Sequence, residues 1–379
     1  MPPKAHAILS ASSSHRWLNC PPSARLCETY EDKGSDYAAE GTDAHSLCEY
    51  KLRKALGMGA VDLSEHLTWY SEEMEDCANG YAAYILELVE AAKEVCSDPV
   101  VLIEQRVDFS RWVEQGFGTS DAIIISDGTL RVIDYKHGLG VLVEADNNPQ
   151  MMCYALGALE LFDAIYDIDS VAMTVYQPRR QNVSTFEMSK DDLYRWAEEV
   201  LKPTAELAFA GDGNFLCGEW CGFCKAKHEC RARAEANLLL AQYDFKLPPL
   251  LEDSEIEVIL SRADQLVSWV NDIKEYALQQ AISGKDWTGF KLVEGRSNRR
   301  YTDEAAVTQA VTSAGFDPYE RKLLGITAMQ KLLGKSRFEE LLSAYIEKPQ
   351  GKPTLVPESD KRPVMNNAKT DFMEENDYE

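Results

Sequence analysis

The sequence predicts an α/β fold in which helices flank a mixed central sheet, followed by a mainly helical C-terminal region. A β-hairpin is the clearest indication, because Asp127-Gly128 lies between two runs rich in β-branched residues. Segments with helical spacing alternate with short apolar runs as far as about residue 235, and helical patterns dominate beyond it. We therefore expect a first domain at 1–235, a mainly helical domain at 236–347 and an acidic, disordered tail at 348–379.

The expected elements of the first domain alternate between the two types. In chain order they are a helix at 42–56 with Thr42 as N-cap, a helix at 70–96, a strand at 100–109, a hairpin at 119–136 with a type I′ turn, a helix from Asn148-Pro149, a strand at 171–179 and a helix capped by Ser189.

The C-terminal region has one long helical pattern and several short ones. A helix is expected at 253–283, where apolar residues step by four and three; this spacing predicts internal packing rather than dimerisation. A short strand is expected at 289–295. Two small helices should then open with capping boxes, at Thr327…Gln330 and Ser336…Glu339.

Composition and charge restrict the classes of function. The chain of 379 residues is 45% hydrophobic, enough for a real core, and has a net charge of −24 that repels nucleic acid in general. The charge is uneven, with basic stretches at 224–234 and 290–301. No apolar run of about 18 residues exists, and the N-terminus lacks the apolar stretch of a signal peptide, so we expect a cytoplasmic protein without membrane contact.

The hairpin places two carboxylates opposite each other. With Asp127-Gly128 as the turn, paired positions sum to 255, so Asp121 faces Asp134. Lys136 follows Asp134 by two residues and shares its face. Facing carboxylates require a cation, and hard ions such as Mg²⁺ or Mn²⁺ suit carboxylate oxygens. The alternative is a charged strand end in which Lys136 merely offsets the two aspartates.

Two carboxylates, a divalent metal and a lysine suit phosphodiester hydrolysis. The metal polarises the phosphate and lowers the pKa of bound water, and the lysine orients that water or offsets developing negative charge.

The order of these motifs resembles the PD-(D/E)XK nuclease superfamily. Gly118-Thr119-Ser120-Asp121 matches GxxD, and Asp134-Tyr135-Lys136 matches the DxK motif. The string EGTDAH at 40–45 resembles the helix motif of RecB-type nucleases, which implies that His45 is a metal ligand. Gln150 and Tyr154 match QxxxY, one helical turn apart, which implies contact with DNA.

The resemblance implies a restriction-endonuclease-like fold and a Mg²⁺- or Mn²⁺-dependent DNA nuclease, with exonuclease action as the first expectation. Its metal would be held by His45, Asp121, Asp134 and the Tyr135 carbonyl, with Lys136 as the catalytic lysine. The family often has Glu at the position of Asp134. The aspartate side chain is shorter, which alters the metal preference. Glu104 is a further candidate acid, with an exposed strand position as the alternative.

Four of the ten cysteines fall between 217 and 230. Their spacing does not match a zinc ribbon. It resembles the C-terminal triplet of iron–sulfur nucleases of the AddB and CRISPR-adaptation type, whose fourth cysteine lies far upstream. The resemblance implies a [4Fe-4S] cluster, with zinc as the alternative, on four ligands: Cys20, Cys221, Cys224 and Cys230. Cys217 is a possible replacement for one of them, and the remaining cysteines, Cys27 among them, are expected to be buried apolar residues or bystanders.

The whole chain also resembles a phage and prophage family, which implies a role near DNA recombination, repair or replication inside a bacterial host, with phage proteins as partners. Two other functions remain open: a DNA- or protein-binding scaffold without turnover, and a redox-sensing regulator. Further phosphate contacts are expected from Arg16, Arg179, Arg180 and the basic stretch at 290–301.

Overall fold

The computed structural model describes residues 7–31, 34–239, 251–293, 301–319 and 323–347. The chain divides into two compact units, Met1–Lys285 and Asp286–Glu379. The predicted tail at 348–379 lies outside the described residues.

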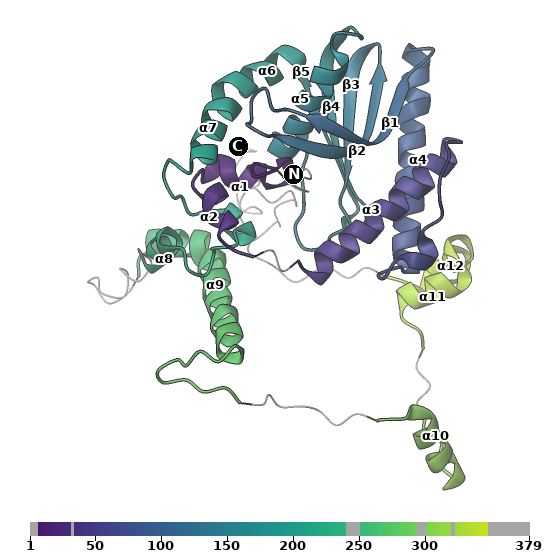
Figure 1. Ribbon diagram of the computed structural model, residues 1–379. Coiled ribbons are helices and arrows are strands. Elements are labelled where there is room, and N and C mark those ends of the chain that lie inside the picture. Colours follow the sequence, from purple (N-terminus) through teal and green to yellow (C-terminus); the bar gives the residue numbers. More distant parts are fainter. Residues whose placement is uncertain (1–6, 32–33, 240–250, 294–300, 320–322, 348–379) are drawn as a thin grey trace, which may run out of the picture. The chain divides into compact units, whose positions relative to one another are not determined.

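A five-stranded mixed sheet forms the centre of the first unit, as predicted (Figure 1). The strands lie in chain order: β1 (Val100–Asp108), β2 (Phe117–Ser126), β3 (Gly128–Tyr135), β4 (Ile168–Gln177) and β5 (Asn182–Ser189). Only β3 and β4 run parallel, and a helix joins them as a parallel crossover requires. Strand β5 was not predicted, although every second residue of its sequence is half-buried, which is the pattern of an edge strand with one covered face.

The predicted hairpin register is confirmed, but the predicted turn type is wrong. Ala122 pairs with Ile133 and Ser126 with Thr129, so paired positions sum to 255. Of the two turn residues only Gly128 has a positive φ, at 76°, whereas a type I′ turn needs a positive φ at both. The register survives because it depends on the length of the turn rather than on its type.

Helices cover both faces of the sheet (Figure 1). On one face lie α3 (Asp36–Ala55) and α4 (Glu72–Val95), which pack on the even-numbered residues of β2. On the other lies α5 (Pro149–Phe162), together with the short α1 (Ser14–Asn19) and α2 (Ser23–Glu28). A sheet covered on both sides explains why β2 is buried at every residue from Ser120 to Ile125.

Side-chain caps define where these helices begin. Asn148 accepts hydrogen bonds from the N–H groups of Gln150 and Met151, as expected for the start of α5. The expected cap at Thr42 is wrong, because α3 starts earlier: Ser35 caps it, and the Thr42 hydroxyl donates to the Ala38 carbonyl within the helix.

The rest of the first unit is helical. It contains α6 (Lys190–Trp196), which Ser189 caps as predicted, a π-helical turn (Ala197–Leu201), α7 (Lys202–Ala210), α8 (Arg231–Leu238) and α9 (Asp253–Ile282). The long helix α9 matches its predicted span, but none of its residues is buried, so the expected internal packing of its apolar seam is not found among the described residues. No described helix has the length and apolar character needed to cross a bilayer.

The second unit contains α10 (Glu304–Ser313), α11 (Ile326–Leu333) and α12 (Lys335–Leu342). The two predicted capping boxes are wrong, because α11 and α12 begin one residue before Thr327 and Ser336, after glycine N-caps. The predicted strand at 289–295 is absent from its described part, 289–293.

Candidate functional site

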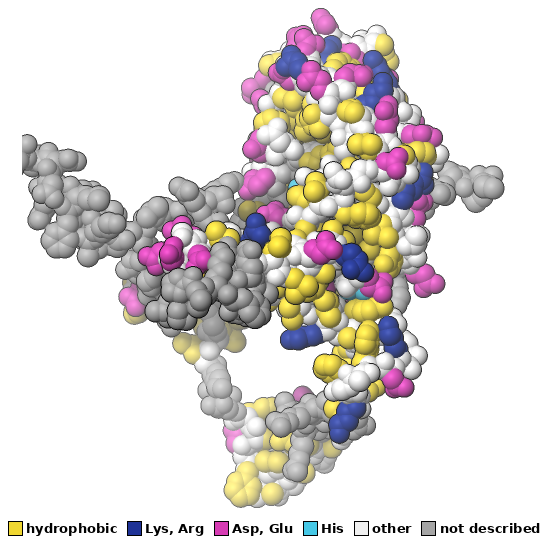
Figure 2. Space-filling model, turned by 90° about the vertical axis from the view of Figure 1, so that its left-hand side faces the viewer, with side chains coloured by type: hydrophobic (Ala, Val, Ile, Leu, Met, Phe, Trp, Pro, Cys, Tyr) yellow, Lys and Arg dark blue, Asp and Glu magenta, His cyan; other side chains and the backbone are white. Residues whose placement is uncertain are grey.

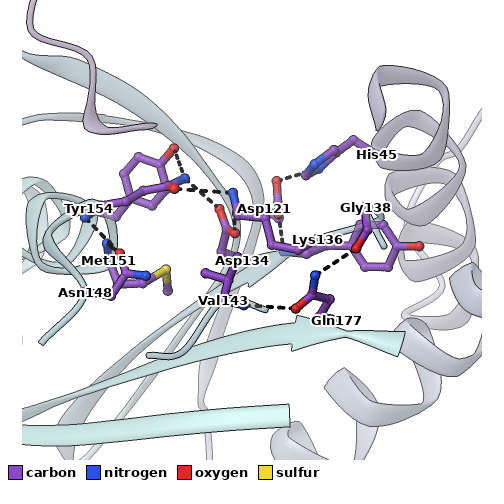
Figure 3. A network of polar contacts seen from close by, with 12 residues as sticks. His45, Asp121, Asp134, Lys136, Gly138, Val143, Asn148, Met151, Tyr154 and Gln177 are labelled. Carbon is purple, nitrogen blue, oxygen red and sulfur yellow. Dashed lines mark hydrogen bonds and ion pairs between the residues drawn. The ribbon is translucent and has the colours of Figure 1, made fainter. Parts of the chain in front are cut away.

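Asp121 lies in the middle of β2 and Asp134 near the end of β3, each one step beyond the last ladder pair of these two strands. Their carboxylates point to different partners (Figure 3). Asp121 Oδ1 lies 3.0 Å from His45 Nδ1, and its Oδ2 accepts a hydrogen bond of 2.6 Å from the Tyr135 N–H. This one carboxylate therefore joins helix α3 to the end of β3.

His45 reaches Asp121 from the buried side of α3. Its ring also meets the Tyr135 ring edge to face, with centroids 5.6 Å apart. Burial alone would lower the pKa of His45, but the adjacent Asp121 carboxylate outweighs burial and raises that pKa to about 9. In the metal-free protein the pair is thus an imidazolium–carboxylate ion pair.

Asp134 belongs to a second set of contacts, with α5 and with the residue that ends the motif. Lys136 Nζ lies 2.9 Å from Asp134 Oδ2, which confirms that the two side chains share a face. Gln150 Nε2 donates to Asp134 Oδ1 at 3.1 Å and lies 3.1 Å from the Tyr154 hydroxyl. Lys136 also donates to Gln150 Oε1 at 3.3 Å. The expected spacing of Gln150 and Tyr154 on one helix face is thus confirmed, and their contact with DNA stays a prediction.

Burial dominates the electrostatics of this second set. Asp134 is only 3% exposed, and burial raises the pKa of its carboxyl group although Lys136 opposes the shift. Burial would lower the pKa of Lys136, but Asp134 raises it above its usual value, so the lysine is an ammonium ion. The Oδ2 atom of Asp134 has this ion pair but no hydrogen bond.

The glycine of the GxxD motif lets α5 approach β2. A Cβ atom on Gly118 would lie 2.6 Å from the ring of Tyr154, closer than any real contact. The next loop is fixed from β4, where Gln177 donates to the Gly138 carbonyl at 2.8 Å and accepts from the Val143 N–H at 3.1 Å (Figure 3). Gln177 also donates to the Val141 carbonyl at 2.8 Å. The packing of Tyr154 on Gly118 and the hydrogen bonds of Gln177 thus support the site without involving its charged side chains.

Glu104 is the residue that the sequence left undecided, and the structure brings it to the site. Glu104, His45 and Asp121 each offer one ligand atom, and these three atoms lie within 4.8 Å of one another. Burial, then the Asp121 charge, raises the pKa of Glu104 to about 7. Glu104 lies opposite Asp121 between two ladder pairs of β1 and β2, with a φ of 52°. A non-glycine residue in this left-handed region costs about 1–3 kcal/mol and often marks a functional site.

No sequence signal fixed this position. Segment 109–116 joins β1 to β2 with an irregular loop, so no short turn sets their register. The predicted strand at 100–109 placed Glu104 in the sheet but did not place it opposite Asp121.

The four predicted cluster ligands meet in one place. Residues 217–230 fold against the N-terminal helices, and a cavity of about 20 Å³ is lined by Cys20, Cys221, Cys224 and Cys230. Three cationic side chains, Arg16, Lys227 and Arg233, line the same cavity. Burial raises the pKa of the Cys20 thiol, and the contact with Cys27 raises the pKa of the Cys224 thiol.

Two further cysteines lie beside these four. Cys27 Sγ is 3.6 Å from Cys224 Sγ, and this contact, opposed by burial and assisted by Arg16, lowers the pKa of Cys27 to about 5. Cys217 contacts Cys221 and, with the Gly218 N–H, lowers the pKa of Cys221 to about 6. Cys27 is buried, as the sequence predicted, and lies beside the predicted ligands; the contact spans 197 residues of sequence and no local pattern reveals it.

The predicted phosphate contacts are largely occupied by the protein itself. Arg16 is buried and donates to the carbonyl and hydroxyl of Ser23. Arg179 pairs with Glu40 at 3.0 Å and with Glu73 at 3.3 Å. Arg180, on an exposed loop, donates to the Leu139 carbonyl. Most of the basic stretch at 290–301 lies outside the described residues.

The chain is similar to a solved structure and to a protein family. The structure is titled "Crystal structure of SSO0001": it is 14% identical, the match covers 49% of this chain and 95% of that one, and the TM-score is 0.21. A TM-score this low supports no statement about fold or function. The family is described as "Protein of unknown function (DUF2800)" and matches residues 6–363, nearly the whole chain. The protein therefore belongs to the DUF2800 family.

Proposed function

We propose that this protein is a metal-dependent DNA nuclease that hydrolyses phosphodiester bonds, with exonuclease action as the first expectation. One observation carries the proposal: two adjacent sets of contacts meet where β3 ends, one that pairs Asp121 with His45 and one that holds Asp134 with Lys136 and Gln150. An ordinary charged strand end would leave such groups in solvent, whereas both aspartates are at most 9% exposed.

The residues present fit a divalent cation such as Mg²⁺ or Mn²⁺. His45, Glu104 and Asp121 offer an imidazole and two carboxylates within 4.8 Å of one another, and Asp134 Oδ2 is buried without a hydrogen bond. When bound, the cation would polarise the phosphate and lower the pKa of a water molecule. The role of the Tyr135 carbonyl as a further ligand remains part of the proposal.

Lys136 acts in this proposal through its charge. Because Asp134 keeps it protonated, it offsets the negative charge that develops on the phosphate and orients the attacking water, rather than taking a proton from it. Gln150 on α5 donates to Asp134 and to the Tyr154 hydroxyl, and Gln150 is half-buried whereas Tyr154 is buried. We therefore assign the DNA contact to Gln150 and the support of that contact to Tyr154.

DNA has to reach the site against an acidic surface. On the face shown in Figure 2, the described basic side chains lie scattered among acidic and apolar ones and do not gather into one patch. Recognition therefore depends on the local groups of the network and on the cation, or on a basic partner that delivers the DNA, such as a phage recombination or replication protein.

We further propose that Cys20, Cys221, Cys224 and Cys230 hold a [4Fe-4S] cluster. The shared cavity and its cationic lining support this assignment, and zinc on the same ligands is the alternative. The cluster would tie α1 to the segment before α8, which closes the first unit.

The test is degradation of end-labelled DNA with Mg²⁺ or Mn²⁺ by wild type and Lys136→Met. Methionine keeps the length of the side chain and removes its charge, so we expect the rate to fall by about 10²–10³. Lys190→Met is the matched control, because Lys190 also pairs with an aspartate, Asp163, but outside the network; it should retain the wild-type rate. Labels at the 5′ and 3′ ends, on blunt and single-stranded DNA, establish the polarity.

If the DNA stays intact with wild type and with both variants, the proposed nuclease activity is refuted. If wild type binds the DNA with Mn²⁺ present but leaves it intact, the scaffold alternative replaces the proposal. Lys136→Met with the activity of wild type would leave the proposed role of the lysine without support.

A further inference from the structure

The two sides of the site differ in how their negative charge is compensated. On the side of α5, Asp134 has the Lys136 ammonium at 2.9 Å and the Gln150 amide at 3.1 Å. On the side of α3, Asp121 has the Tyr135 N–H and the His45 imidazole, and this imidazole is the one described side chain of basic type that Asp121 pairs with; Glu104 lies in the same group. The excess negative charge therefore lies at Glu104, His45 and Asp121.

The nearest cationic side chain does not neutralise Glu104. Arg53 on α3 donates through Nε to Glu49 at 2.7 Å and through Nη2 to the Ile103 carbonyl at 3.4 Å. Within the described residues, the Glu104 carboxylate makes no hydrogen bond or ion pair of its own. A partly buried carboxylate beside a second one either takes up a proton or is stabilised by a cation, and a divalent cation at this group would keep Glu104 ionised.

The backbone holds Glu104 in this position at a local interruption of β1. The ladder pairs Ile103 with Ala122 and Gln105 with Ser120, and the Glu104–Asp121 pair between them is missing. The φ of 52° at Glu104 accompanies that gap. A regular strand would not require this conformation, so the position of the carboxylate is built into the fold.

We propose that Glu104 is a direct ligand of the divalent cation, which gives a His45–Glu104–Asp121 site that prefers Mn²⁺ to Mg²⁺. This inference deepens the proposed function, since it adds a ligand to the same metal. The preference follows from the donor set. Mg²⁺ keeps most of its water and binds through one or two carboxylates, whereas an imidazole with two carboxylates replaces more of that water and suits Mn²⁺ better.

The inference is tested by Mn²⁺ binding to the full-length, metal-free protein without DNA, measured by the electron paramagnetic resonance of free Mn²⁺. Glu104→Gln should weaken the affinity at least about tenfold, the scale of losses at metal sites. Glu160→Gln is the matched control, because it removes the same charge from α5, where Glu160 pairs with Arg111 outside the group and offers it no ligand atom; its affinity should stay within about twofold of wild type. Wild type should bind Mn²⁺ more tightly than Mg²⁺ in a competition assay.

Thermal unfolding separates a ligand from a merely structural residue. Without metal, Glu104→Gln should melt at a higher temperature than wild type, since it removes a carboxylate that repels Asp121. With Mn²⁺, wild type should be stabilised and Glu104→Gln should lose most of that stabilisation. A structural role alone predicts a lower melting temperature for the variant under both conditions.

The inference is overturned if Glu104→Gln binds Mn²⁺ as tightly as wild type and gains the same thermal stabilisation. Its failure is distinct from that of the nuclease. DNA cleavage with unchanged Mn²⁺ binding in the variant removes Glu104 from the site and leaves the nuclease intact. If wild type binds Mn²⁺ through Glu104 but does not cleave DNA, the metal site is supported and the nuclease activity is refuted.

Discussion

Asp121 and Asp134 are identical side chains on adjacent strands, yet the fold gives them different chemical environments. Asp121 accepts a hydrogen bond from a backbone N–H and contacts an imidazole. Asp134 is almost fully buried, and burial raises its pKa. The Lys136 ammonium is therefore what favours the ionised form of Asp134, so loss of Lys136 would also change the charge of the site.

The cysteine site allows a prediction that distinguishes individual residues. Protein purified without oxygen should contain iron and inorganic sulfide, and Cys20→Ser should lose both because Cys20 lines the cavity. Cys27→Ser should retain iron, because Cys27 contacts Cys224 but does not line the cavity. Cys153→Ser is the control, on a buried thiol of α5 outside this site. Iron and sulfide analysis measures all three.

Two results would contradict this assignment. Zinc in place of iron would establish the zinc alternative on the same ligands. Loss of iron in Cys27→Ser, with retention in Cys20→Ser, would exchange the roles of the two cysteines that the N-terminal segment supplies.

Individual elements show why part of the site was predictable. The two-residue turn at Asp127-Gly128 sets the register of β2 and β3, so the sequence alone placed Asp121 near Asp134 and Lys136 on the face of Asp134. Glu104 was not predictable, because the register of β1 is set by packing rather than by a turn. The N-cap of α3 was misplaced for a similar reason: Ser35 and Thr42 are both competent caps, and tertiary packing selects the earlier one.

The close packing of α5 on β2 predicts that Gly118→Ala is destabilising. The added methyl group would collide with the Tyr154 ring, which would have to move away from Gln150, and overpacking of this kind costs about 1–3 kcal/mol of unfolding free energy. Gly41→Ala is the matched control, since Gly41 lies within α3 with open space around it. There the same substitution should stabilise the protein by about 0.5–1 kcal/mol.

Urea denaturation followed by tryptophan fluorescence measures both variants. Equal stability of Gly118→Ala and wild type would show that Tyr154 moves without cost, and its support of Gln150 would then be dispensable.

At the scale of the whole molecule, the site lies where the two helical layers meet at the end of β3. Asp121 contacts α3 of one layer and Asp134 contacts α5 of the other, so the site forms only when both layers are packed on the sheet. This arrangement places a cation-dependent centre inside a chain whose net charge is −24. The cation must supply attraction for phosphate that the protein as a whole does not.

This opposition of charges predicts an unusual salt dependence of the proposed DNA cleavage. A protein that binds DNA through 6–10 phosphate contacts loses about 10³–10⁵ in affinity between about 50 and 200 mM salt. Here, long-range repulsion between two polyanions is screened as the Debye length shortens to about 10 Å at 0.1 M. With Mn²⁺ in excess and DNA below saturation, the cleavage rate should therefore rise or stay constant between about 20 and 100 mM KCl. A dinucleotide substrate, which carries little charge, is the control and should show a smaller change. A steep fall in the rate with salt would reveal a basic surface that dominates binding, and it would contradict the view that the local network and its cation attract the DNA.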